Sequence, residues 1–90
     1  MYDIKTTPFA ERNIEKLKKR TSVDDFERIR SAIRNLAQEP QPQGAIKLKK
    51  RENTYRIRIG KFRIIYQIRD KEMLVLVVKV ARRTESTYGF

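Results

Sequence analysis

Residues 55–68 constrain the fold most, because apolar and polar side chains alternate along them. This alternation is typical of a half-buried β-strand. Gly60 and Lys61 interrupt it, and a two-residue loop that begins with glycine suits a type II′ turn. The sequence therefore predicts a β-hairpin in which residues 60–61 form the whole turn and Ile59 lies opposite Phe62.

The predicted register gives the hairpin two unlike faces, because directly opposed residues of an antiparallel pair share a face. The apolar face comprises Tyr55, Ile57, Ile59, Phe62, Ile64, Tyr66 and Ile68. The other face, called the arginine face below, comprises Arg56, Arg58, Arg63, Ile65 and Gln67. Arg58 would oppose Arg63, and opposed like charges destabilise a sheet. This face is either a solvated basic surface or an anion site, since guanidinium binds phosphate bidentately.

The composition limits the available chemistry. A chain of 90 residues has room for a single domain, residues 1–90. It contains no cysteine and no histidine, which excludes disulfides, thiolate metal sites and histidine-dependent catalysis. We expect no metal site and no cofactor. No apolar run approaches membrane-spanning length and the N-terminus does not resemble a signal peptide, so we expect a cytoplasmic protein without a membrane partner.

The positive charge is concentrated in the second half of the chain. The formal net charge is +11; residues 1–44 contribute 9 basic and 7 acidic side chains, and residues 45–90 contribute 13 and 4. A basic half beside a near-neutral half indicates a polyanionic partner, most simply nucleic acid. A membrane surface is a poorer fit, because the basic half is predicted to be strands and not a basic amphipathic helix.

The remaining segments predict an α+β domain of order β-α-α-β-β-β. Residues 2–6 form a short strand, Thr7 and Pro8 begin a helix that runs to about residue 20, and Ser22 caps a second helix that ends before Pro40. Residues 73–80 are almost continuously apolar, as in a central buried strand. We expect a twisted, mostly antiparallel sheet with a helical hairpin packed on one face, and the arginine face open on the other.

One charged residue interrupts the apolar strand. If the strand stays regular, Lys79 shares a face with Val75, Val77 and Arg83, because side chains alternate along a strand.

Several segments resemble toxins of the RelE/ParE superfamily from bacterial type II toxin–antitoxin pairs. They are K-L-K at 47–49, Y-R-I-R-I-G-K-F-R-I-I-Y at 55–66, and the basic segment at 77–83 followed by Tyr88. The element order matches along nearly the whole chain. The hairpin motif is fairly specific, whereas the helices are generic. The chain departs from the pattern at Arg82, where many relatives have histidine, and at Lys50, where they have glycine.

The resemblance implies an endonuclease of the RelE-like branch that cleaves mRNA codons in the ribosomal A site. The implied catalytic residues are Arg56, Arg58, Arg63, Arg83 and Tyr88. The candidate RNA-binding residues are Lys47, Lys49, Lys50, Arg51, Lys61 and Arg82. The implied partners are mRNA, the ribosome with its RNA, and an acidic antitoxin that folds on binding.

The residue types favour a mechanism without metal. Two-metal hydrolysis needs clustered carboxylates, and the basic half has only Glu52, Asp70, Glu72 and Glu85. RNA carries its own nucleophile, the 2′-hydroxyl, and cations can stabilise the charge that develops on the phosphate. Arginine is a poor general base. Arg56 would then orient the 2′-hydroxyl, and the base stays open among Tyr88, Lys49 and Lys61.

Two other functions remain open at this point. One is a toxin that inhibits gyrase and has no nuclease activity. The other is a small non-catalytic RNA-binding domain, which typically interleaves exposed aromatic side chains with the basic ones.

Overall fold

The computed structural model describes residues 1–83, so Tyr88 lies outside the described residues. The chain forms β1 (Asp3–Thr6), α1 (Pro8–Arg20), α2 (Val23–Asn35), β2 (Ile46–Lys47), β3 (Thr54–Ile59), β4 (Phe62–Arg69), the 3-10 helix η1 (Asp70–Glu72) and β5 (Leu74–Arg82). The predicted α+β class and element order are confirmed. The two-residue β2 is an addition that the sequence did not predict.

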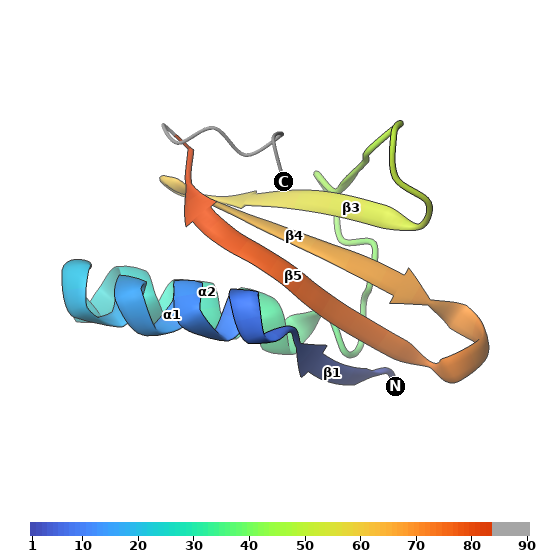
Figure 1. The fold of residues 1–90 in the computed structure, drawn as a ribbon, viewed down its shortest axis with the longest axis horizontal. Coiled ribbons are helices and arrows are strands. Elements are labelled where there is room, and N and C mark those ends of the chain that lie inside the picture. Colours follow the sequence, from blue (N-terminus) through green and yellow to red (C-terminus); the bar gives the residue numbers. More distant parts are fainter. Residues whose placement is uncertain (84–90) are drawn as a thin grey trace.

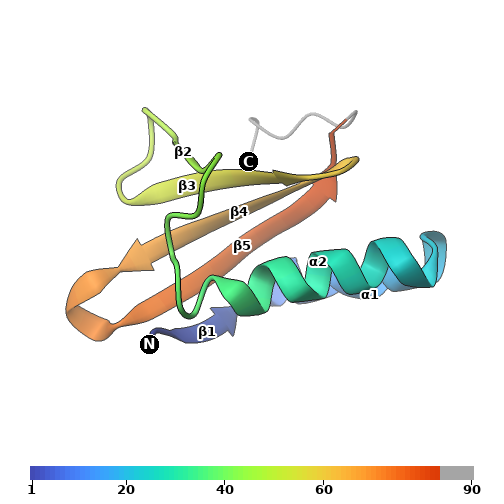
Figure 2. The same ribbon diagram turned by 180° about the vertical axis from the view of Figure 1, so that it is seen from behind.

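The strands form one sheet in the order β1-β5-β4-β3-β2. β1 is parallel to β5 and the other neighbours are antiparallel. The two helices run antiparallel along one face of the sheet (Figure 1), with α1 against β5 and α2 against β3. The view from behind shows α2 on the near side of the same layer (Figure 2). β5 has a strand on each edge, as its apolar run predicted.

Side-chain caps start both helices. The Thr7 hydroxyl accepts the Ala10 N–H at 3.1 Å, and the Ser22 hydroxyl accepts the Asp25 N–H at 3.1 Å. Each cap satisfies a backbone donor that has no partner within the helix. The helical hairpin is therefore set by local sequence.

The β3–β4 hairpin has the predicted register. Ile59 pairs with Phe62 and Arg58 pairs with Arg63. Gly60 has a φ of +57° while Lys61 keeps a negative φ, as a type II′ turn requires. Tyr66, on the apolar face, is fully buried. Its hydroxyl donates to the Pro40 carbonyl at 2.6 Å, which ties the segment after α2 to the core. Burial raises the pKa of this hydroxyl.

A β-bulge in β5 overturns the predicted orientation of Lys79. Val77 pairs with Tyr66, but Lys79 pairs with Ile65, so Val78 is an extra residue. Ile65 and Tyr66 point to opposite faces, and each shares its face with its own partner. Lys79 therefore lies on the arginine face, opposite to the face of Val77. The prediction that Lys79 shares a face with Val75 and Val77 was wrong, because it assumed a regular strand.

Asn13 of α1 supports β5 just after the bulge. β1 pairs with β5 only as far as Val77. Beyond that residue, α1 lies beside this edge of β5. The Asn13 Oδ1 accepts the Val80 N–H at 3.1 Å. A helix side chain thus satisfies a strand donor where the neighbouring strand has ended.

We expect Asn13→Leu to lower the free energy of unfolding by about 1–3 kcal/mol, because it removes the acceptor of a partly buried N–H. Asn13→Asp keeps an acceptor oxygen and should lose less. Urea denaturation of the three proteins measures the difference. If Asn13→Leu is as stable as the unsubstituted protein, this hydrogen bond does not hold the strand.

Candidate functional site

A hollow lies where the β3–β4 turn meets the end of β5. Its volume is about 410 Å³, and its lining consists of one glycine and four cationic residues: Gly60, Lys61, Arg63, Arg82 and Arg83. Lys61 and Arg83 are exposed, and Arg63 and Arg82 are half-buried. A lining of this composition attracts anions, and guanidinium groups match phosphate in particular.

Hydrogen bonds join the two segments that form the hollow. The Arg83 N–H donates to the Lys61 carbonyl at 2.7 Å, and the Arg83 Nη1 donates to the Gly60 carbonyl at 3.4 Å. The end of β5 is therefore tied across the hairpin turn. Arg83 reaches the hollow because the strand pairing carries it there.

Arg82 is held from the helix side. Its guanidinium lies 5.5 Å from the centroid of the Phe62 ring, a cation–π distance. Its Nη2 also donates to the Arg20 carbonyl at 3.5 Å, at the C-terminal end of α1, where the helix dipole favours a cation. The Arg82 guanidinium is therefore held on the helix side of the sheet, although Arg82 also lines the hollow.

The arginine face adjoins the hollow. The sequence predicted that this face is open, but part of it is buried. Arg58 is exposed, whereas Arg56 is only 7% exposed and Ile65 only 1%. Ile46 of β2 lies directly opposite Arg56 and Lys79 lies opposite Ile65. These flanking side chains share the face and form a row across the sheet. Alternation predicted the face of each hairpin residue correctly but not how much its neighbours cover it.

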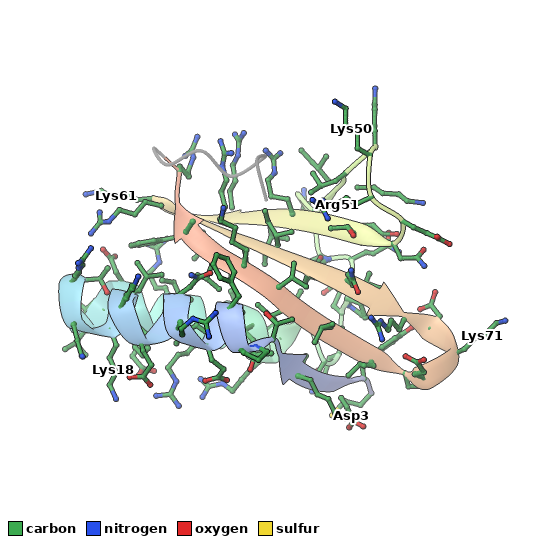
Figure 3. The ribbon with its side chains drawn as sticks, viewed as in Figure 1. Asp3, Lys18, Lys50, Arg51, Lys61 and Lys71 are labelled. Atoms are coloured by element: carbon green, nitrogen blue, oxygen red, sulfur yellow. The ribbon has the colours of Figure 1, made fainter. Side chains whose placement is uncertain are left out.

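The structure brings together the candidates near the turn and separates the others. Lys61, Arg63, Arg82 and Arg83 share the hollow, and Arg58 lies opposite Arg63. Lys50 and Arg51 lie at the far end of β3 from Lys61 (Figure 3). The six residues of β3 span about 20 Å. The basic run Lys47, Lys49, Lys50 and Arg51 is therefore a separate surface.

Lys79 also belongs to this face, although the sequence did not identify it as a candidate site residue. It lies on the arginine face only because of the extra residue in β5. A signal was present, because a lysine at a position that regular alternation assigns to the core is typical of an irregular strand. The signal indicates an irregularity without locating it.

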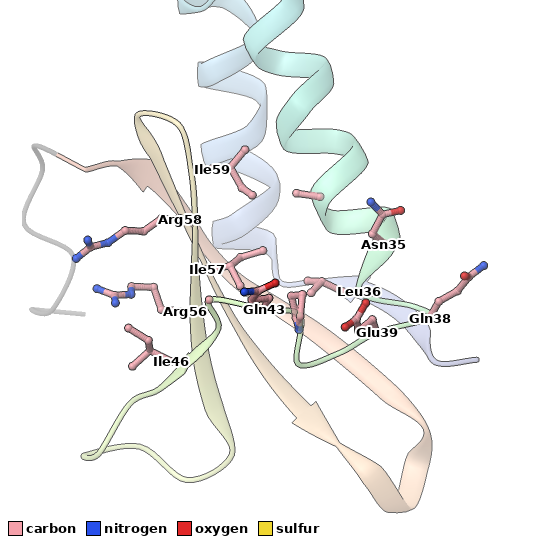
Figure 4. A pocket seen from close by; sticks show the side chains of 13 residues that line it. Asn35, Leu36, Gln38, Glu39, Gln43, Ile46, Arg56, Ile57, Arg58 and Ile59 are labelled. Carbon is pink, nitrogen blue, oxygen red and sulfur yellow. The ribbon is translucent and has the colours of Figure 1, made fainter.

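A second pocket, of about 580 Å³, lies between β3 and the end of α2. Ile57 and Ile59 point from β3 toward α2, while Arg56 and Arg58 point to the other side of the strand (Figure 4). Leu36 and Ile46 add to the apolar part of the lining. The pocket therefore combines apolar walls with a polar rim formed by Asn35, Gln38, Glu39 and Gln43. Such a lining suits the apolar side of a chain segment better than a phosphate.

A family model decides what kind of protein this is. The model of the ParE toxin of type II toxin–antitoxin systems, parDE, matches residues 4–87. The chain belongs to this family. It is the toxin of a toxin–antitoxin pair, and the resemblance to the RelE/ParE superfamily is confirmed.

Several solved structures of similar fold are toxin–antitoxin complexes. The RelBE2 complex of Mycobacterium tuberculosis is 25% identical over 91% of the toxin and 98% of that chain, with a TM-score of 0.73. The intact RelBE complex of Escherichia coli is 18% identical over 94% and 100%, with a TM-score of 0.76. The archaeal RelE–RelB complex from Pyrococcus horikoshii is 22% identical over 94% and 98%, also with 0.76. No curated protein matches the toxin in sequence.

Residues 1–83 of the toxin lack both a metal-binding cluster and a membrane-spanning helix. No three histidine, cysteine, aspartate or glutamate side chains gather closely enough to hold a metal ion. No helix in this part is both long and apolar enough to cross a membrane.

Proposed function

We propose that the toxin is an endoribonuclease that cleaves mRNA in the ribosomal A site. The observation that carries this proposal is the hollow lined by four cations and a glycine, next to the opposed pair Arg58 and Arg63. Surfaces that need only solubility mix charges of both signs. A surface that concentrates guanidinium groups in a hollow favours a bound phosphate.

The opposed arginines support the same conclusion energetically. Arg58 and Arg63 occupy directly paired positions, where like charges repel. An anion between or beside them removes that repulsion and gains charge-assisted hydrogen bonds. The arrangement therefore costs stability in the free toxin and favours substrate binding.

The proposed reaction uses the 2′-hydroxyl of the mRNA. The 2′-oxygen attacks the adjacent phosphorus, the bond from phosphorus to the 5′-oxygen breaks, and a 2′,3′-cyclic phosphate forms. The 2′-hydroxyl loses a proton and the departing 5′-oxygen gains one. Arg63 and Arg83 stabilise the charge on the pentavalent phosphate. Fixed cations contribute most in this transition state, because the negative charge is greatest there.

Proton transfer is assigned less directly. Arg56 is one of the catalytic residues that the resemblance implies, but arginine keeps its proton in proteins, so we assign it an orienting role. Of the lysines considered for proton transfer, Lys61 lines the hollow and Lys49 belongs to the separate basic run beyond β3. Lys61 is therefore the better placed of the two. The chain has no histidine to do this work.

The scarcity of acid–base groups explains why the ribosome is part of the proposal. Attack by the 2′-oxygen requires it to lie in line with the departing 5′-oxygen, and holding that geometry is a large part of catalysis. The ribosome presents the codon in a fixed conformation. The toxin then adds the cations.

The pocket between β3 and α2 supports the acidic antitoxin as a partner. Its apolar walls fit the apolar side of an amphipathic segment, and the toxin's formal net charge of +11 favours an acidic one. A segment of this kind gains structure as it binds. The toxin should copurify with a small acidic protein encoded beside it. Failure of every such protein to relieve toxicity would contradict this part of the proposal.

Gyrase inhibition is the second candidate function, and the ParE name of the matching family model favours it. A purely RNA-binding function fits less well, because the hairpin aromatics Tyr55, Phe62 and Tyr66 lie on the apolar face, where Phe62 and Tyr66 are buried. Buried rings such as Phe62 and Tyr66 cannot stack on RNA bases.

Mapping the 5′ ends of cellular mRNA after brief induction of the toxin distinguishes the two candidates. New ends inside reading frames, without a DNA-damage response, are expected. Intact mRNA together with DNA-damage signalling would overturn the nuclease and establish gyrase inhibition.

A further inference from the structure

We propose that Lys79 binds an RNA phosphate as an additional cation of the arginine face, an inference that rests on the proposed function. Lys79 lies opposite Ile65 on β4, and the next residue along that face of β4 is Arg63. Diagonal neighbours on adjacent strands are about 7–8 Å apart, within reach of long side chains. Lys79 is also partly exposed, so it can serve the same polyanion as Arg63 and Arg58.

The β-bulge in β5 is the reason that Lys79 lies on the arginine face. In a regular strand Val78 would oppose Ile65 and Lys79 would oppose Ile64, which is 0% exposed. An ammonium group at that position would be buried among apolar side chains at high cost. The extra residue turns Lys79 to the basic face instead. Bulges commonly re-aim side chains beside functional sites.

The same shift also places Arg83. After the bulge, Ala81 pairs with Arg63 and Arg82 with Phe62, so Lys79, Ala81 and Arg83 follow one another along the arginine face. Asn13 holds this shifted segment through its hydrogen bond to the Val80 N–H. Asn13 is therefore a positioning residue, and Lys79 belongs to the surface that contains Arg83.

Three variants separate the charge of Lys79 from its packing. Lys79→Met removes the charge and keeps the length, Lys79→Arg keeps the charge, and Lys71→Met removes an exposed lysine from η1, near the far end of β5. Lys71 thus controls for the change in net charge. Thermal unfolding of each variant checks that it is folded before activity is compared.

The experiment measures two quantities for each protein: single-turnover kcat/KM on ribosomes programmed with mRNA, and the salt dependence of binding to a single-stranded oligoribonucleotide. Lys79→Met should lower kcat/KM about 10- to 100-fold, as expected for a hydrogen bond to a charged group. It should also reduce the slope of log K against log salt by about 0.7. Lys79→Arg should restore most of both, and Lys71→Met should match the unsubstituted toxin.

The outcomes distinguish the inference from the function on which it rests. An active toxin whose Lys79→Met variant behaves like Lys71→Met overturns the role of Lys79 and leaves the nuclease intact. Equal losses in Lys79→Met and Lys79→Arg also overturn it, because they indicate a packing role. A toxin that binds the oligoribonucleotide but does not cleave mRNA on programmed ribosomes refutes the nuclease, while the salt slope still tests Lys79. A toxin that does not bind RNA refutes both.

Discussion

Arg83→Ala is expected to lower the rate of mRNA cleavage on the ribosome about 100- to 1000-fold, the usual effect of removing one group that stabilises transition-state charge. Arg83 lines the hollow and is tied to the turn through the carbonyls of Lys61 and Gly60. Its charge is needed most when the phosphate becomes pentavalent. The affinity for the ribosome should therefore change much less than the rate.

Single-turnover cleavage and ribosome binding, measured on the same preparations, test this prediction. Arg12→Ala is the matched control, since it removes an exposed arginine from α1 and should leave both quantities unchanged. Arg83 is itself exposed, so its variant should fold normally. A loss of affinity as large as the loss of rate would show that Arg83 contributes to docking and not to the chemical step.

A substrate with a 2′-deoxy sugar at the cleavage position should give no detectable product. In the proposed reaction the attacking oxygen is the 2′-oxygen of the mRNA itself, so a substrate without it has no nucleophile. A matched substrate carries the deoxy sugar one nucleotide away and should be cleaved almost normally. Reaction of the first substrate would require hydrolysis by water and would refute the mechanism.

The local features of the fold were predictable from sequence. Alternation through residues 55–68 and glycine at position 60 fixed the hairpin register, and the structure confirms the pairs Ile59–Phe62 and Arg58–Arg63. The caps at Thr7 and Ser22 are equally local. These predictions succeeded because each depends on neighbouring residues alone.

The errors arose where distant segments meet. The bulge at Val78 depends on which register the core tolerates, and Asn13, far away in the sequence, helps to hold it. The burial of Arg56 depends on β2, whose Ile46 lies beside it. The alternation of side chains along a strand gives no information about such contacts between distant segments. Lys79 was therefore placed on the wrong face, and the arginine face was expected to be open.

The candidate site was predicted in part for the same reason. The sequence supplied all four cations of the hollow, but only the tie between the β3–β4 turn and the end of β5 shows that they belong together. The basic run that contains Lys50 and Arg51 looked equivalent in the sequence. The length of β3 separates it from the hollow.

The central claim is that the toxin supplies cations while the ribosome supplies the geometry of the RNA. The most direct measurement compares cleavage of one mRNA, at equal concentration, when it is free and when its codon occupies the A site of a programmed ribosome. We predict rapid cleavage at that codon in the ribosome-bound mRNA and almost none in the free RNA. Equal cleavage of both would contradict the account.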